Sequence, residues 1–166
     1  MDGSTEGYQL DDDPARIDLD VVWAFFSTDA YWGRWRTRED VAAQVTGAWR
    51  VVGAYAPDGM VGFARAVSDG VAFAYLADVF VLPDHRGRGL GRRLVAAMID
   101  DGPGAGFRWV LHTADMHRLY AGFGFAPPDA TLLERPAARP ATDTEPSEPG
   151  HRPTVHVGDG EHPIVE

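Results

Sequence analysis

The sequence predicts an α+β fold whose sheet is mixed but mostly antiparallel, with helices flanking it. Two turn-forming segments, 57–59 and 68–70, separate three apolar runs, a pattern typical of strands joined by hairpins. The third run leads into a glycine-rich loop and then into an amphipathic helix. Hairpin-linked strands followed by a strand-loop-helix unit predict an α+β layout with a mostly antiparallel sheet.

The first part of the chain predicts a short strand and two helices, followed by the three strands. Residues 8–10 begin the short strand. Asp18 and Asp20 are suited to cap the start of a helix with apolar residues at 21, 22, 25 and 26. Thr37 and Asp40 form the pattern of a capping box before a second helix at 41–45. The three strands are predicted at 49–56, 60–67 and 71–82.

The remaining elements are a helix, a strand, a short helix and a last strand. Residues 107–112 predict a buried strand, 115–125 a short helix with Gly124 as its left-handed cap, and 131–133 the last strand. The helix after the glycine-rich loop has one apolar side, which consists of Leu90, Leu94, Val95, Met98 and Ile99. The short helix at 115–125 also has one apolar side, which consists of Met116, Leu119, Tyr120 and Phe123.

The most informative segment is 79–94, in which a strand runs through a proline into an arginine- and glycine-rich loop and then into a helix. The loop and the first helical turn expose backbone N–H groups without an internal partner, and such groups suit a pyrophosphate. A Walker loop is excluded because the chain contains no lysine. Gly87, Gly89 and Gly91 are spaced as GxGxG, which does not match a dinucleotide fingerprint. The alternative is a turn that only caps the helix.

Two motifs together resemble the GNAT superfamily of N-acetyltransferases over about residues 8–134. Arg86, Gly89 and Gly91 occupy the fixed positions of that superfamily's acyl-CoA loop, and residues 119–125 match its L-Y-x-x-F-G-F ending. The resemblance implies a GNAT-like three-layer fold in which parallel strands four and five splay apart. The acyl-pantetheine arm of acetyl-CoA, the implied co-substrate, would lie between them.

The resemblance also assigns the residues that bind this cofactor. A backbone N–H of Val79 or Phe80 would polarise the thioester carbonyl, and these two residues stay open as alternatives. Val81 would pair with the pantetheine amides. The pyrophosphate loop itself would consist of Arg86, Gly87, Arg88, Gly89, Leu90, Gly91 and Arg92.

Tyr120 and Asp78 are the predicted catalytic residues. The resemblance places Tyr120 at the cofactor's sulfur, where a phenol with a pKa of about 10 can protonate a thiolate, although Tyr120 also fits a core position on its helix. Asp78 is the predicted base because an acid among apolar strand residues is costly to bury without a function or a partner, and an ion pair with Arg65 is the alternative. His112 and His117 are further candidates for the base, with a cap or surface role as the alternative for each. No metal site is predicted.

The acceptor pocket is expected between the first helices and the strand that faces them. Residues 30–36 are rich in aromatic side chains, so they predict a lid or pocket wall, an aromatic cage for a cationic amine, or a hydrophobic plug. Arg34, Arg36 and Arg38 favour an acceptor that carries a carboxylate or a phosphate, unless they only face water. The predicted acceptor-contacting residues are Phe26, Tyr31, Trp32, Trp35, Tyr75 and His112.

Composition narrows the class of protein further. The 166 residues contain no cysteine, no long apolar run and no basic-then-apolar leader, so we expect a cytoplasmic protein that does not enter the membrane. The net charge of −10 divides into −5 for residues 1–13, −2 for 14–134 and −3 for 135–166, which argues against nucleic-acid binding. Residues 1–134 are expected to form the enzymatic domain. Residues 135–166, proline-rich and acidic, predict a disordered tail, with a docking segment as the alternative.

The sequence therefore predicts an enzyme that moves an acetyl group directly from acetyl-CoA to the primary amine of a small metabolite or amino-acid-like acceptor. A protein N-terminal or lysine acetyltransferase is one alternative. A CoA-binding sensor or partner module without catalysis is another. Since the superfamily includes many dimers, the resemblance also favours a homodimer.

Overall fold

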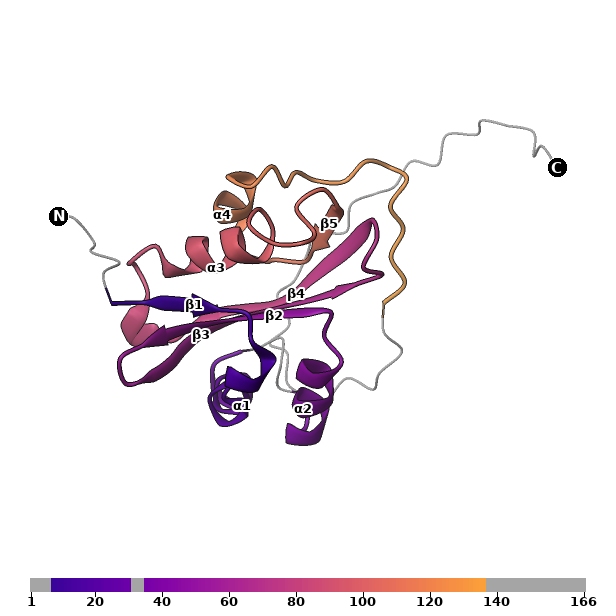
Figure 1. The fold of residues 1–166 in the computed structure, drawn as a ribbon. Helices are drawn as coiled ribbons and strands as arrows, with labels where there is room; N and C mark the ends of the chain where they lie inside the picture. Colours follow the sequence, from indigo (N-terminus) through magenta and orange to yellow (C-terminus); the bar gives the residue numbers. More distant parts are fainter. Residues whose placement is uncertain (1–6, 31–34, 137–166) are drawn as a thin grey trace, which may run out of the picture. The chain divides into compact units, whose positions relative to one another are not determined.

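A computed structural model of the protein describes residues 7–30 and 35–136, and the helices and strands of this part all lie before Glu134. Five strands form one sheet in the order β1-β2-β3-β4-β5 (Figure 1). The strands are β1 Gln9–Asp11, β2 Arg50–Ala56, β3 Gly59–Ser68, β4 Phe73–Val81 and β5 Arg108–Leu111. The helices are α1 Leu19–Thr28, α2 Arg38–Thr46, α3 Leu90–Met98 and α4 His117–Ala121, with short 3-10 helices η1 Pro14–Arg16 and η2 Pro83–His85.

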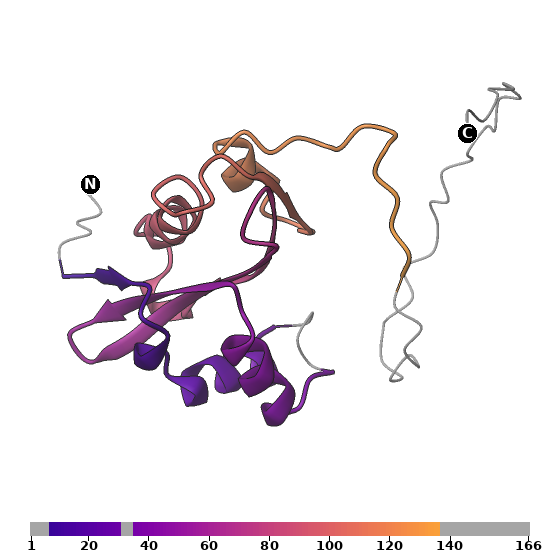
Figure 2. The same cartoon turned by 45° about the vertical axis from the view of Figure 1, so that its right-hand side comes forward.

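The sheet combines both kinds of strand pairing that the sequence predicted. Strands β1 to β4 pair antiparallel, whereas β4 and β5 are parallel, from Phe73 opposite Arg108 to Leu76 opposite Leu111. Helices α1 and α2 cover one face of the sheet and α3 covers the other, with α4 beyond it (Figures 1 and 2). The three-layer α+β fold is therefore confirmed. We call the two sides the α1–α2 face and the α3 face.

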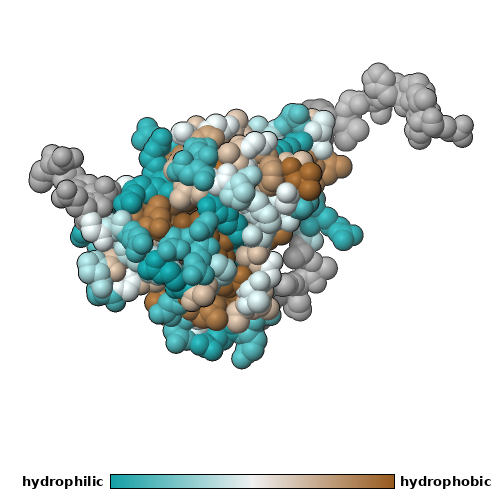
Figure 3. Space-filling view, viewed as in Figure 1, coloured by the Kyte–Doolittle hydropathy of each residue, from teal (hydrophilic) through white to brown (hydrophobic). Residues whose placement is uncertain are grey.

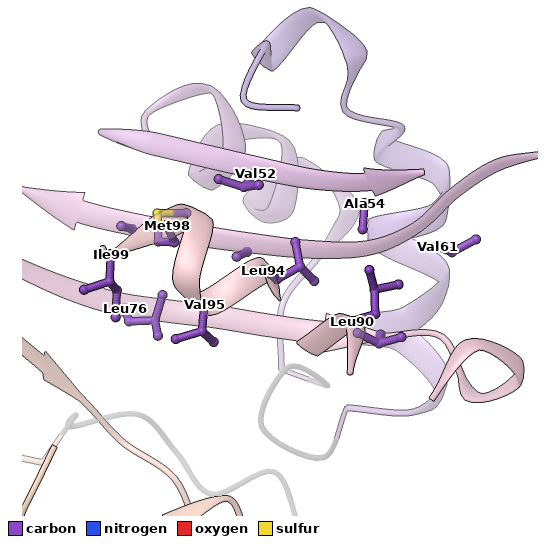
Figure 4. Close-up of a cluster of buried hydrophobic side chains, with 12 residues drawn as sticks. Val52, Ala54, Val61, Leu76, Leu90, Leu94, Val95, Met98 and Ile99 are labelled. Atoms are coloured by element: carbon purple, nitrogen blue, oxygen red, sulfur yellow. The ribbon is translucent and has the colours of Figure 1, made fainter. Parts of the chain in front are cut away.

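The core on the α3 face follows from the predicted apolar side of α3. All five residues of that side are at most 5% exposed and pack against strand residues such as Val52, Ala54, Val61 and Leu76 (Figure 4). Removing such side chains from water stabilises the fold by roughly 1.5–3 kcal/mol each. This burial fixes α3, and with it the loop that precedes α3, against β2 to β4.

The core on the α1–α2 face is built around the ring of Phe80. Phe25 of α1 stacks on this ring, with the centroids 4.0 Å apart and the planes at 9°. Phe26 and Phe63 approach the same ring at centroid distances of 5.9 Å. Aromatic pairs at such distances contribute beyond their buried area, so Phe80 holds α1 onto the centre of the sheet.

Both predicted helix caps are present. The Asp18 carboxylate accepts hydrogen bonds from the N–H groups of Asp20, at 2.9 Å, and Val21, at 3.3 Å. Thr37 and Asp40 form a reciprocal capping box, in which each side chain accepts from the other residue's backbone N–H. The helix starts could be predicted because these bonds connect residues only two or three positions apart.

Two predicted boundaries and one predicted strand are wrong. Strand β4 begins at Phe73 and not at 71, because the Asp69 carboxylate accepts from the N–H groups of Val71 and of the next two residues and so extends the turn. The predicted strand at 131–133 is not formed, since the Asp129 side chain accepts the N–H of Thr131 in a local turn. Helix α4 is limited to His117–Ala121, which leaves Met116 exposed at its N-cap.

The surface that Figure 3 shows carries several separate hydrophobic patches surrounded by hydrophilic residues. Within the described part of the chain, no helix has the length and apolarity that a bilayer crossing requires.

Gly62 offers a test of how closely α3 packs on β3. A Cβ at this position would lie 3.0 Å from Leu94 Cδ1 and 3.1 Å from the Phe80 carbonyl oxygen, so Gly62→Ala must displace α3 or strand β4. We expect this substitution to lower the free energy of unfolding by about 1–3 kcal/mol. Gly106→Ala is the control, because a Cβ there meets no atom within 4 Å. Chemical denaturation of the two variants should separate them, and equal stabilities would contradict this account of the packing.

Candidate active site

The site is organised by the point at which β4 parts from β5. The parallel pairing ends at Leu76 opposite Leu111. On the other side of β4, Asp78 lies opposite Arg65 and Leu76 opposite Ala66, so Ala77 is an extra, bulged residue in β4. Beyond Leu76, β4 has β3 as its only strand neighbour in the described part of the chain. The backbone groups on its other side face an open edge.

Alternation along β4 decides which backbone groups face this open edge. The N–H of Leu82 donates to the carbonyl of Val61 at 2.8 Å, so Leu82 and then Phe80 direct their backbone groups toward β3. Val79 and Val81 must then point the other way. The Val81 carbonyl accordingly accepts a 2.8 Å hydrogen bond from Nε of Arg86, which lies outside the sheet. Of the two residues that the sequence left open for the carbonyl contact, the geometry favours Val79 over Phe80.

The glycine-rich loop leads from β4 through η2 to the start of α3. Gly87 and Gly89 have φ of +73° and +75°, a conformation that residues with a side chain rarely adopt. Gly91 in the first helical turn has no such φ, and a Cβ there would meet only Val81 Cγ2, at 3.9 Å. Neither backbone conformation nor packing within the chain therefore requires glycine at 91, whereas the close approach of a ligand would.

The start of α3 presents backbone donors beside this loop. The first bond of the helix runs from the N–H of Arg93 to the carbonyl of Gly89 at 3.1 Å. The N–H groups of Leu90, Gly91 and Arg92 consequently have no partner within the helix. A helix N-terminus with free donors and a positive dipole end binds phosphate groups. The predicted pyrophosphate residues are thus brought together in one place.

Contacts within the chain hold the arginines around this loop. Arg88 donates to the hydroxyl of Tyr8 at 3.2 Å, and that hydroxyl also bonds Nδ1 of His85 at 2.8 Å. The guanidinium of Arg92 lies 5.0 Å from the ring centroid of Phe123. These contacts connect the loop to the residue before β1 and to the segment after α4, so the positive charges are held close to the start of α3. The sequence did not reveal the role of Tyr8, which is distant in the chain from the loop.

Tyr120 lies on the α3 face. Its ring packs against the buried cluster there and meets the Phe125 ring edge-on at a centroid distance of 5.8 Å. Burial, and to a lesser extent the carboxylate of Asp115, raise the pKa of Tyr120 above its ordinary value. The phenol therefore keeps its proton throughout the neutral range, as an acid must. Packing in the core and a catalytic role for the hydroxyl are compatible in this position.

Asp78 lies on the α1–α2 face and is only 1% exposed. Its carboxylate accepts from Nη1 and Nη2 of Arg36, at 3.1 and 3.0 Å, and from Nε of Arg65 at 2.8 Å. The ion pair with Arg65 is the alternative that the sequence left open. Arg36 as a second partner was not predicted, because nothing in the sequence relates two residues 42 positions apart. With both oxygens engaged and almost no exposed surface, Asp78 is poorly placed to take a proton from an amine directly.

The remaining acceptor-side residues form two groups. Phe26 is buried, and its ring centroid lies 4.6 Å from Cζ of Arg36, while Trp35 is 44% exposed. Tyr75 and His112 form a pair, with 3.0 Å between the phenol oxygen and Nδ1, just where β4 and β5 part. The predicted residues Tyr31 and Trp32 lie outside the described residues. Among the described residues, no group of three or more His, Asp or Glu side chains could hold a metal ion.

Known proteins share this architecture. Residues 19–125 match the model of the acetyltransferase (GNAT) family. The structure is similar to that of a Xanthomonas campestris pv. campestris protein assigned to the GNAT family, with a TM-score of 0.75 and 34% identity, covering 81% of this chain and 96% of that one. It is also similar to an aminoglycoside N-acetyltransferase in complex with CoA, with a TM-score of 0.57 over 80% of this chain and 98% of that one. At 19% identity, this second likeness concerns the fold alone.

A curated relative gives a shorter match. A Gibberella zeae protein assigned by name to the acetyltransferases is 30% identical over 106 residues, which cover 51% of this chain and 58% of that protein. The chain thus spans little more than half the length of that relative. The fold and the matches define the class as an acyltransferase. More closely, the chain belongs to the acetyltransferase (GNAT) family, whose model covers more than half of its residues.

The ion cluster of Asp78 can be tested by its effect on stability. Asp78→Asn leaves two buried guanidinium groups without their carboxylate, so we expect the free energy of unfolding to fall by about 3–5 kcal/mol. Asp20→Asn is the matched control, because Asp20 pairs with Arg38 at an exposed site, where the loss should stay below about 1 kcal/mol. Urea titration of both variants measures the difference. A small effect at Asp78 would show that the cluster contributes little to the fold.

Proposed function

We propose that the protein transfers an acetyl group from acetyl-CoA directly to the primary amine of a small, amino-acid-like acceptor. The observation that carries this proposal is the open edge of β4, which continues through η2 into the glycine-rich loop and the start of α3. A cofactor that has an amide-rich arm and a pyrophosphate would fit this arrangement: the arm would pair with the open strand edge, and the pyrophosphate would bind the N–H groups of the loop and the helix start. Family membership supports acyl transfer in general, and these features support the more specific activity.

The cofactor side of the site would work through backbone groups. The Val79 N–H would donate to the thioester carbonyl, and the backbone groups of Val81 would pair with the amides of the arm. The loop glycines and the N–H groups at 90–92 would hold the pyrophosphate, with the neighbouring arginines adding positive charge. When bound, acetyl-CoA supplies an activated thioester, so the protein's main contribution is to hold the two reactants in line.

Proton transfer would be divided between the two faces of the sheet. Tyr120, on the α3 face and protonated at neutral pH, would give its proton or a hydrogen bond to the departing thiolate. The acceptor would approach from the α1–α2 face, where Phe26 lies, and reach the Tyr75–His112 pair at the point where β4 and β5 part. His112 would take the amine proton directly or through water, whereas Asp78 would have to act through an intervening group.

Two other functions compete with this proposal. A protein N-terminus or lysine as acceptor would use the same cofactor site and differ only on the α1–α2 face. A CoA-binding module without catalysis would keep the loop but would not need Tyr120. We also propose that the protein is cytoplasmic and does not bind nucleic acid, in line with the absence of cysteine and the net charge of −10. The proposal that the protein forms a homodimer rests on the family resemblance alone.

The direct experiment combines cofactor binding with turnover. The protein is incubated with acetyl-CoA and a panel of small amines, and released CoA is read with a thiol dye, to which the cysteine-free chain contributes no background. At a CoA concentration one hundred times its Kd, binding should stabilise the fold by about 2.7 kcal/mol, which a thermal melt detects. Turnover with a small amine supports the proposal. Binding without turnover on any amine would favour the sensor or a protein acceptor.

Tyr120→Phe tests the acid. The ring and its packing remain and only the hydroxyl is lost, so we expect kcat to fall by roughly 10²-fold while the Kd of acetyl-CoA changes little. Tyr55→Phe is the control, because its hydroxyl donates to the Arg16 carbonyl at 3.0 Å on the distant β1–β2 side of the sheet. Steady-state kinetics and isothermal titration of both variants give the comparison. Unchanged kcat in Tyr120→Phe would remove Tyr120 from the mechanism.

A further inference from the structure

The cluster around Asp78 has more positive than negative charge. Two guanidinium groups, those of Arg36 and Arg65, share the single carboxylate of Asp78, which leaves a net charge of +1. The side chains of Arg36, Arg65 and Asp78 are 8%, 9% and 1% exposed. Each guanidinium has five N–H donors and directs two of its nitrogens at Asp78, so donors remain on both.

One of the remaining donors is buried without any partner. Nε of Arg36 is inaccessible and makes no hydrogen bond. No other carboxylate of residues 7–30 and 35–136 forms an ion pair with Arg36 or Arg65. A buried charge and a buried donor without partners are both costly. The described part of the chain thus lacks one anion that this cluster could bind.

The position of the cluster relates it to the acceptor. Asp78 directly precedes Val79, whose N–H faces the open edge of β4, and adjacent strand residues are only about 3.3 Å apart along the strand. The Asp78 side chain is on the α1–α2 face, as shown by its pairing with Arg36 above that face and by the neighbouring Phe80–Phe25 stack. Tyr120 packs on the other face. An anion at the cluster would therefore lie on the acceptor's side of the reacting carbonyl.

We propose that the acceptor carries a carboxylate, which binds the guanidinium groups of Arg36 and Arg65, and that Asp78 is a positioning residue that holds these groups. This acceptor assignment rests on the proposed function. A guanidinium fork matches a carboxylate in shape and charge. The rings of Phe26 and Trp35, 4.6 and 5.3 Å from Cζ of Arg36, screen the cation from water and strengthen its attraction for an anion. Arg38, by contrast, pairs with Asp20 at an exposed site.

The test uses matched amines that differ only in the anionic group. Amino carboxylates with one to four carbons between amine and carboxylate are compared with their carboxamides and with the corresponding alkylamines, each with saturating acetyl-CoA. For at least one spacer length, kcat/KM should be about ten-fold or more higher with the carboxylate, as expected for a charge-assisted hydrogen bond. Equal rates for the three members of every set would overturn the assignment while leaving the proposed function intact. Turnover of none of these amines, with CoA still bound, would count against the proposed function itself.

Variants of Arg36 then test whether this residue causes the preference for amines that carry a carboxylate. Arg36→Gln should abolish the preference by raising KM for the carboxylate, with little change in KM for the alkylamine, and Arg36→Lys should restore it in part because it keeps the charge without the fork. Arg16→Gln is the control, since Arg16 also pairs with an aspartate, Asp11, and lies over an aromatic ring, that of Tyr55 at 4.2 Å. Thermal melts and CoA affinity confirm that each variant is folded. A preference that survives in Arg36→Gln would overturn the role of Arg36.

Discussion

The separation of β4 from β5 after Leu76 is the constraint on which the rest of the molecule depends. Backbone groups in a sheet must find partners, and an open edge in the middle of a fold is a costly arrangement unless something else binds there. Here the open edge belongs to an inner strand of the sheet, which pairs with β3 on its other side from Ala74 to Val81. The strand is therefore rigid while its open side stays available. That combination suits a backbone that must hold a reactive carbonyl in a fixed position.

The same separation assigns different tasks to the two faces of the sheet. The α3 face carries the start of α3, which follows the glycine-rich loop, and Tyr120, and both pack against one buried cluster. The α1–α2 face carries the aromatic cluster around Phe80 and the Asp78 ion cluster. Because neighbouring side chains of a strand point to opposite faces, residues 78, 79 and 80 of one strand would contact both partners of the proposed reaction. Catalysis by positioning then follows from strand geometry and helix packing, and needs few specialised side chains.

The fold was largely predictable because its signals are local. Helix caps, the apolar side of α3 and the hairpin turns each depend on residues a few positions apart, and the structure confirms the predictions made from them. The start of β4 was misplaced because one carboxylate, that of Asp69, competes with strand pairing for three N–H groups. The strand predicted at 131–133 failed for a similar reason, since three apolar or β-branched residues do not overcome a turn held by Asp129.

The candidate site was predictable only in part, because its decisive contacts are distant in sequence. The spacing of the loop residues and the family resemblance predicted the loop and Tyr120, and an acid in an apolar strand predicted Asp78. No pattern in the sequence could pair Asp78 with Arg36, or place the bulge at Ala77 that sets which N–H groups face the open edge. Both follow from how the start of α2 and strand β3 meet β4 in three dimensions.

The Asp78 cluster places charged groups in the buried centre of this fold, which requires a physical reason. Apolar side chains of similar volume would pack beside Phe63 and Phe80 at no greater cost, since a buried ion pair seldom stabilises a protein more than its hydrophobic replacement. Stability alone therefore does not explain two arginines and one aspartate at this place. Their position next to the reacting edge, with one positive charge in excess, is explained if a negatively charged group of the acceptor completes the cluster. The protein would then discriminate between amines by the anion that accompanies them, because an amine without that anion would leave the buried guanidinium groups unpaired.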